Sequence, residues 1–124
     1  MNKTLMLLLM IFCHIVDDYY LQGWLSSAKQ KKWWNKNAPD SLYKCDYIMA
    51  LLMHSFSWTF SVSVFPILYA VILGEKWYPI LFILNLILHM FVDNLKANEK
   101  RINLIQDQII HLFQIFFIWI WYMF

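Results

Sequence analysis

Seven ionisable side chains recur at helical spacing within the apolar part of this chain. Three His–Asp pairs lie four residues apart and a fourth histidine stands alone: His14 with Asp18, His89 with Asp93, Asp107 with His111, and His54. Residues four apart share one face of a helix. Imidazoles and carboxylates on facing helices form the metal sites of helical bundles, so this pattern predicts a metal centre between helices.

The composition places these groups in an apolar setting. The chain has 124 residues, of which 61% are hydrophobic and 19% aromatic. This is too apolar for an ordinary soluble domain of this size, and ionisable groups at membrane depth are costly and therefore indicate function. The net charge of +2 does not indicate a nucleic-acid partner. Cys13 and Cys45 form no CxxC pair, and we expect both to be packing residues.

Four stretches are long enough to be transmembrane helices, since a span needs about 20 apolar residues. We predict spans over residues 4–22, 46–73, 77–98 and 102–122, within one membrane domain of residues 1–124. Residues 3–16 resemble a signal peptide, but no small-residue cleavage site follows, so we expect an uncleaved first span. The turns at 74–76 and 99–101 are short, which favours antiparallel neighbours. The predicted fold is an all-α, polytopic, four-helix antiparallel bundle.

The long connection, residues 23–45, is basic and rich in tryptophan. We expect an interfacial segment that contacts anionic lipid headgroups, in part as an amphipathic helix on the membrane surface; a plain cytoplasmic loop is the alternative. Eight of the ten lysines and arginines fall on the side of this loop. The positive-inside rule then makes that side cytoplasmic and places both termini outside, in a bacterial inner membrane.

The histidines are predicted to share one depth. Each lies eight or nine residues from the loop-side end of its span, which corresponds to roughly 12–14 Å along a helix. The third and fourth spans are also symmetric about Lys100: Asp93 and Asp107 are each seven residues away, and His89 and His111 are each eleven. In an antiparallel hairpin this sets Asp level with Asp and His level with His.

The donor set suits a divalent metal, with zinc preferred and iron or manganese as alternatives, because thiolates are lacking nearby. Seven candidate ligands exceed the four of one tetrahedral ion, which leaves either two ions or carboxylates that orient the imidazoles. Two ions would suit hydrolysis of a lipid-borne or small phosphoester. In that reaction we predict Asp18 as ligand or general base, Lys29 and Lys96 as cations for the anionic group, and Gln22 and Gln108 as positioning groups.

The same residues carry a resemblance to a known family. Four segments, which touch most of the chain, resemble the small bacterial and phage membrane proteins catalogued as domain of unknown function 3307: residues 14–22 followed by Lys29, 51–54, 89–97 and 107–111. That family has no established activity, so the resemblance implies which residues matter. It has a small or apolar residue where Asp17 stands, and Asp17 lies about 100° around a helix from Asp18, so we expect Asp17 near the surface and outside the site. A looser likeness to membrane-bound metal-dependent hydrolases, which also place His and Asp in short helical spans, implies a hydrolase.

Other functions use the same residue types. A proton- or metal-ion transporter or channel would need a polar path to the outer side, where the sequence offers Asn85, Gln114 and a few serines, so we expect a site that opens on one side. The remaining alternatives are a non-catalytic phage or bacterial envelope interaction protein, structural histidines that hydrogen-bond between helices, and a bis-histidine haem. A homo-oligomer would complete so thin a bundle.

Overall fold

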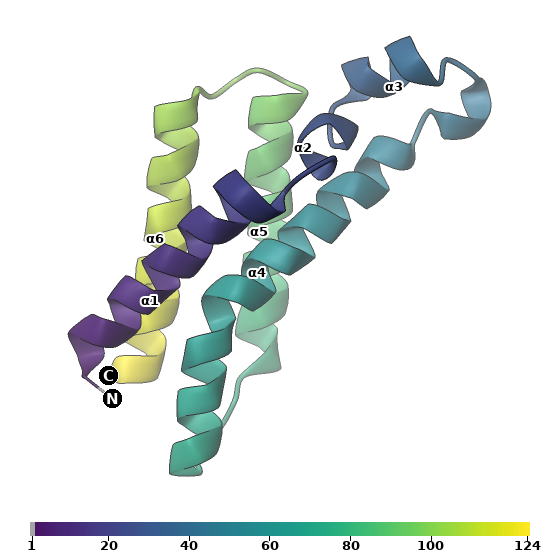
Figure 1. Ribbon diagram of the computed structural model, residues 1–124. Helices are drawn as coiled ribbons and strands as arrows, with labels where there is room; N and C mark the ends of the chain where they lie inside the picture. Colours follow the sequence, from purple (N-terminus) through teal and green to yellow (C-terminus); the bar gives the residue numbers. More distant parts are fainter. Residues whose placement is uncertain (1) are drawn as a thin grey trace.

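Residues 2–124 are described by a computed structural model, and within them the secondary structure is entirely helical. The long helices are α1 (Lys3–Val16), α4 (Asp46–Leu73), α5 (Pro79–Ala97) and α6 (Leu104–Met123) (Figure 1). Four helical segments are long and apolar enough to cross a membrane: Lys3–Leu21, Ser41–Leu73, Pro79–Ala97 and Leu104–Met123. The prediction of an all-α chain with four such helices is confirmed.

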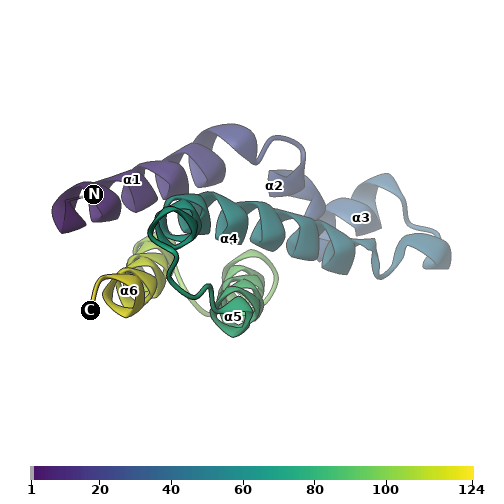
Figure 2. The ribbon, with the colours of Figure 1, turned by 90° about the horizontal axis from the view of Figure 1, so that it is seen from below.

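The long helices surround one shared interior. Helix α1 packs against α4 and α6, and α5 packs against the same two helices from the other side, so α1 and α5 lie diagonally opposite (Figure 2). The distribution of polar and apolar side chains between surface and interior is inverted relative to that of a soluble protein. Large apolar side chains such as Phe12 and Phe113 are 62% and 69% exposed, whereas the four histidines are at most 2% exposed.

Local signals set the helix ends. Helix α4 has the predicted bounds, 46–73, because Gly74 follows it in the left-handed conformation (φ 68°) that ends helices. Helix α6 begins two residues later than predicted, since Asn103 and Gln106 form a capping box before Leu104. Helix α5 begins at Pro79, where a missing N–H costs nothing. Cys45 is exposed just before α4, so the expectation that both cysteines pack is wrong for this one.

The first predicted helix, 4–22, changes geometry partway. After Val16 the chain forms a π-helical turn, Asp17–Leu21, in place of continued α-helix. Asp17 is 1% exposed and faces the interior. Its backbone N–H still bonds the Cys13 carbonyl as in an α-helix, so Asp17 lies on the same helix face as the buried His14, three residues earlier. The expectation that Asp17 lies near the surface is wrong, because it considered only the angle between Asp17 and Asp18.

The connection 23–45 contains two short helices, α2 (Leu25–Ala28) and α3 (Lys31–Asn37), and a 3-10 turn at Ser41–Tyr43. Asn98, at the end of α5, binds this segment twice: its side-chain nitrogen donates to the Lys29 carbonyl (3.0 Å), and its oxygen accepts from the Lys31 N–H (2.7 Å). The segment is thereby attached to the end of α5.

Candidate metal centre

Four histidines, one from each long helix, meet in the interior. The rings of His89 and His111 stack with their centroids 4.2 Å apart. The His54 ring lies 5.3 Å from that of His89, and the His14 ring lies 5.9 Å from that of His111. The polar stripes of the four helices therefore form one layer.

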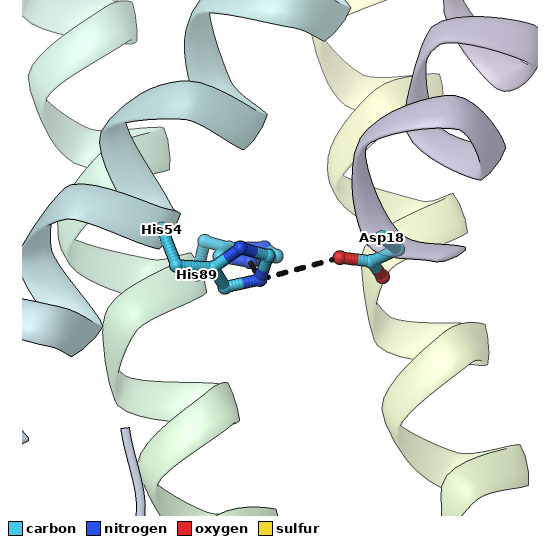
Figure 3. Close-up of side chains that lie close together, drawn as sticks. All are labelled: Asp18, His54 and His89. Carbon is cyan, nitrogen blue, oxygen red and sulfur yellow. Dashed lines mark hydrogen bonds and ion pairs between the residues drawn. The ribbon is translucent and has the colours of Figure 1, made fainter. Parts of the chain in front are cut away.

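One set of candidate ligands comprises Asp18, His54 and His89, which point toward one another from the π turn after α1, from α4 and from α5 (Figure 3). Nε2 of His54 lies 3.4 Å from Nε2 of His89 and 3.3 Å from Oδ1 of Asp18. Oδ2 of Asp93 is also 3.3 Å from Nε2 of His54. A tetrahedral ion with ligand bonds of about 2.0–2.2 Å holds its ligand atoms about 3.3–3.6 Å apart, so these contacts have suitable spacing.

A second set, made of His89, Asp93 and His111, lies beside the first and shares His89 with it. Nε2 of His111 is 3.4 Å from Oδ1 of Asp93 and 3.3 Å from Oδ1 of Asp107. The two oxygens of Asp93 therefore face different sets, Oδ2 toward His54 and Oδ1 toward His111. A carboxylate in this position can bridge two ions.

The proton on His111 can be assigned from its neighbours. Nε2 of Gln114 lies 3.3 Å from the Asn85 carbonyl oxygen, which can only accept, so Oε1 of Gln114 faces His111. Nδ1 of His111 must then donate to that oxygen at 3.0 Å, and the Nε2 lone pair of the neutral ring is free. Within the described residues, Nε2 of His111 and Oδ1 of Asp107 are both buried without a hydrogen-bond partner. Buried polar atoms are nearly always satisfied, and a shared cation would satisfy both.

His14 does not fit the role of metal ligand that its spacing predicts. The indole N–H of Trp58 can only donate, so Nδ1 of His14 accepts it, at 2.8 Å. Nε2 of His14 then carries the proton and donates to Oε1 of Gln108 at 3.0 Å. Both ring nitrogens therefore have protein partners, and in this arrangement neither of them is free to bind a metal ion.

The side-chain amide of Gln108 also donates hydrogen bonds to two carboxylates. Its Nε2 lies 3.3 Å from Oδ2 of Asp18 and 3.1 Å from Oδ2 of Asp107. Gln108 thus contacts two candidate ligands, and its predicted role toward water or substrate stays a prediction. Gln22 donates to the backbone carbonyl of Asp18 at 3.0 Å, so it supports the π turn from outside the cluster.

The two predicted cationic residues are both paired with carboxylates. Lys29 enters from the end of α2 and places Nζ 2.5 Å from Oδ2 of Asp93, with the two side chains 7% and 1% exposed. Lys96 pairs with Oδ2 of Asp107 and is 27% exposed. The ammonium groups therefore neutralise two candidate ligands, and the structure does not bring them together at a separate anion site.

The charge of the cluster is unbalanced. Four buried carboxylates (Asp17, Asp18, Asp93 and Asp107) face two lysine ammonium groups, which leaves two negative charges when the imidazoles are neutral. Uncompensated charge is expensive in a low-dielectric interior. One divalent cation would balance the cluster.

On the side away from the 23–45 connection, the polar layer ends quickly. Gln114 and Asn85 continue it by one contact, in which Nε2 of Gln114 donates to Oδ1 of Asn85 at 2.8 Å. Beyond them lies an apolar cluster of buried side chains: Met6, Met10, Trp58, Val62, Ile115, Ile118 and Met123. Apolar packing therefore closes the layer of histidines and aspartates on this side.

Several residues that complete the site escaped the sequence analysis. Trp58 stacks on His89 with ring centroids 4.1 Å apart and lies four residues after His54, a spacing that could have identified it. Asp17 accepts from Ser57 and Ser61 at 2.6 and 3.1 Å. Its inward position could have been predicted from its spacing of three residues from His14, which places both side chains on one helix face.

Compared with known protein families, curated proteins and solved structures, the chain has no match. The functional assignment therefore depends on the geometry of the site.

Proposed function

We propose that this protein is an integral membrane protein whose four antiparallel helices hold one or two divalent metal ions, zinc preferred, and that it hydrolyses phosphoester substrates reaching it from the side of the 23–45 connection. The observation that carries the proposal is the spacing of nitrogen and oxygen atoms around His54 and His111, 3.3–3.4 Å, in a buried cluster that carries two uncompensated negative charges when its imidazoles are neutral.

Membrane insertion is supported by the inverted polarity of the helices. An outward surface of Phe, Leu and Ile suits lipid, and ionisable groups turned to a bundle interior are the arrangement that membrane spans tolerate. We place the 23–45 connection on the cytoplasmic face with both termini outside, because most lysines and arginines lie on that side.

Each residue of the cluster is assigned a role in metal binding or in proton transfer. His54, His89, His111, Asp93 and Asp107 are assigned as ligands; when bound, the metal supplies Lewis-acid activation of water and of an anionic substrate. Asp18 has the most exposed side chain of the four carboxylates, at 7%, and is assigned as a ligand through Oδ1 or as the proton acceptor.

Access is proposed from the loop side, where the partly exposed members of the cluster lie. Lys96 is 27% exposed, and Gln108 is half-buried. The apolar cluster beyond Gln114 argues against a continuous pathway for ions, which favours a one-sided enzyme over the transporter alternative.

The test begins with elemental analysis of the protein purified in detergent. We expect one or two zinc, iron or manganese ions per chain, lost in His54→Gln and in His111→Gln and retained in the control Asp46→Asn. Hydrolysis of bis(p-nitrophenyl) phosphate should then depend on the metal and stop with chelator. A protein without stoichiometric metal would refute the proposal. A metal-loaded protein that moves zinc or protons into liposomes and hydrolyses nothing would replace the enzyme with a transporter.

A further inference from the structure

An apolar groove runs along the outside of the bundle between α1 and α6. The two helices pack side by side near the chain termini and diverge toward the 23–45 connection (Figure 1). The groove has a volume of about 380 Å³ and is lined by Leu, Ile and Phe side chains, among them Leu7 and Ile11 of α1 and Ile109, Leu112 and Phe116 of α6. Such a lining on a lipid-facing surface suits a hydrocarbon chain.

Both walls of the groove lead to the same polar contact. On α1, Ile11 lies three residues before His14, so the two share a helix face. On α6, Leu112 lies four residues after Gln108 and shares a face with it. Nε2 of His14 is 3.0 Å from Oε1 of Gln108, whose Nε2 lies 3.3 Å from Oδ2 of Asp18. The loop-side end of the groove therefore meets the candidate metal centre at Gln108.

The groove also has the direction of a lipid chain. Gln108 and Phe116 lie four and twelve residues after Leu104, the first residue of α6, which corresponds to about 6 and 18 Å along the helix. The groove thus begins near the loop-side surface and runs toward the middle of a hydrocarbon core about 30 Å thick. A lipid whose headgroup lies on the loop side directs its chains the same way.

The loop-side end of the groove offers a cation to an anionic headgroup. Lys96 and Gln108 both donate to Oδ2 of Asp107, and the Lys96 side chain is 27% exposed. An ammonium has three N–H donors, so its bond to Asp107 leaves others for a phosphate oxygen. A second groove, between α5 and α6, has a volume of about 240 Å³, and the polar residues of its described lining are neutral amides, Asn85 and Gln114. The charge at Lys96 therefore favours the α1–α6 groove for an anionic lipid.

We infer that the phosphoester taken by this centre is lipid-borne, with a hydrocarbon chain in the α1–α6 groove and its headgroup entering past Gln108. The inference rests on the proposed function and narrows it, because a small water-soluble phosphoester would leave the groove unused. Lipid tails are as apolar as the leucines of the groove, so a chain gains little affinity by leaving the bilayer. The groove acts by orienting the phosphoester at the centre, and orientation is a large part of a reaction barrier.

The test compares two phosphodiesters that share one leaving group, hexadecyl p-nitrophenyl phosphate and ethyl p-nitrophenyl phosphate. In both, water replaces p-nitrophenolate at phosphorus, and the zinc-loaded protein in detergent micelles is assayed for the released p-nitrophenolate. Leu112→Trp fills the α1–α6 groove. Leu84→Trp places the same side chain in the α5–α6 groove and is the matched control, since the two leucines are 42% and 56% exposed.

We expect Leu112→Trp to lower kcat/KM for the hexadecyl substrate by up to about 100-fold, the effect of displacing a substrate by about 1 Å. Its kcat/KM for the ethyl substrate should be unchanged, and Leu84→Trp should change neither value. Unchanged hydrolysis of the hexadecyl substrate by Leu112→Trp would overturn the inference. An equal loss for both substrates, or an equal loss in both variants, would overturn it as well.

A measurement on the wild type keeps the inference testable if Leu112→Trp does not fold. Phosphatidic acid with a diazirine in one acyl chain is photolysed in phosphatidylcholine nanodiscs that contain the protein, and the labelled residues are located by mass spectrometry. We expect label concentrated on the α1–α6 groove and displaced by unlabelled phosphatidic acid. Equal labelling of the two grooves, or an unlabelled α1–α6 groove, would overturn the inference. Concentrated label without hydrolysis of either phosphodiester would refute the hydrolase and retain the lipid site, so the two failures are distinguishable.

Discussion

The pair formed by Lys29 and Asp93 gives a quantitative test of how the polar interior is held together. Asp93→Asn leaves the Lys29 ammonium buried, at 7% exposure, without its counter-ion 2.5 Å away. Breaking one partner of a buried ion pair costs about 3–5 kcal/mol. Removing both charges is far less costly, so Asp93→Asn combined with Lys29→Met should recover part of this loss. The recovery is incomplete because Asp93 also contacts His54 and His111.

The assay is a double-mutant cycle on equilibrium unfolding by SDS in mixed micelles, with chelator present throughout. We expect a coupling free energy of about 2–3 kcal/mol, at the upper end of the range for residues in contact. The control cycle uses Arg101 and Glu99, a pair at 3.1 Å whose side chains are 73% and 36% exposed; its coupling should be about 1 kcal/mol or less. Equal coupling in the two cycles would show that Lys29 is hydrated in solution and that the reasoning about the buried charge is wrong.

Three further outcomes follow from the hydrogen bonds of the centre. His54→Gln should abolish stoichiometric zinc, as measured by elemental analysis. His14→Gln should retain zinc with about 10–100-fold weaker affinity, because His14 acts only through Gln108. Equal loss of zinc in both variants would make His14 a ligand. Trp58→Phe leaves Nδ1 of His14 without its donor and should lower the free energy of unfolding by about 1–3 kcal/mol, a prediction refuted by unchanged unfolding in SDS. Chelation should lower the thermal midpoint, and zinc at about 100 times its Kd should restore about 2.7 kcal/mol; a midpoint indifferent to zinc would contradict the binding site.

The sequence alone was enough to predict those features of the site that depend only on helix geometry. The depth of the histidines follows from the rise of a helix, and the symmetry of the α5–α6 hairpin brings His89 and His111 into contact. The bounds of α4 were also predictable, because the glycine after Leu73 supplies a standard helix end.

The remaining features depend on contacts that no local pattern specifies. The proton on His14 is decided by Trp58, which comes from another helix, so the sequence could not separate this histidine from the candidate ligands. Lys29 was predicted to bind an anionic group, but its pairing with Asp93 depends on the path of the chain around α2, which the sequence does not specify. By contrast, the inward position of Asp17 was predictable, because regular α-helix already places it on the face of His14, three residues earlier.

The attachment of the 23–45 connection to α5 has a mechanical consequence. Asn98 holds the backbone at Lys29 and Lys31, and the Lys29 side chain extends from the same point to Asp93. Whatever lifts this stretch of chain away from α5 must also withdraw a positive charge from the interior. The position of the 23–45 connection and the net charge of the interior are therefore coupled, so a measurement of one also reports on the other.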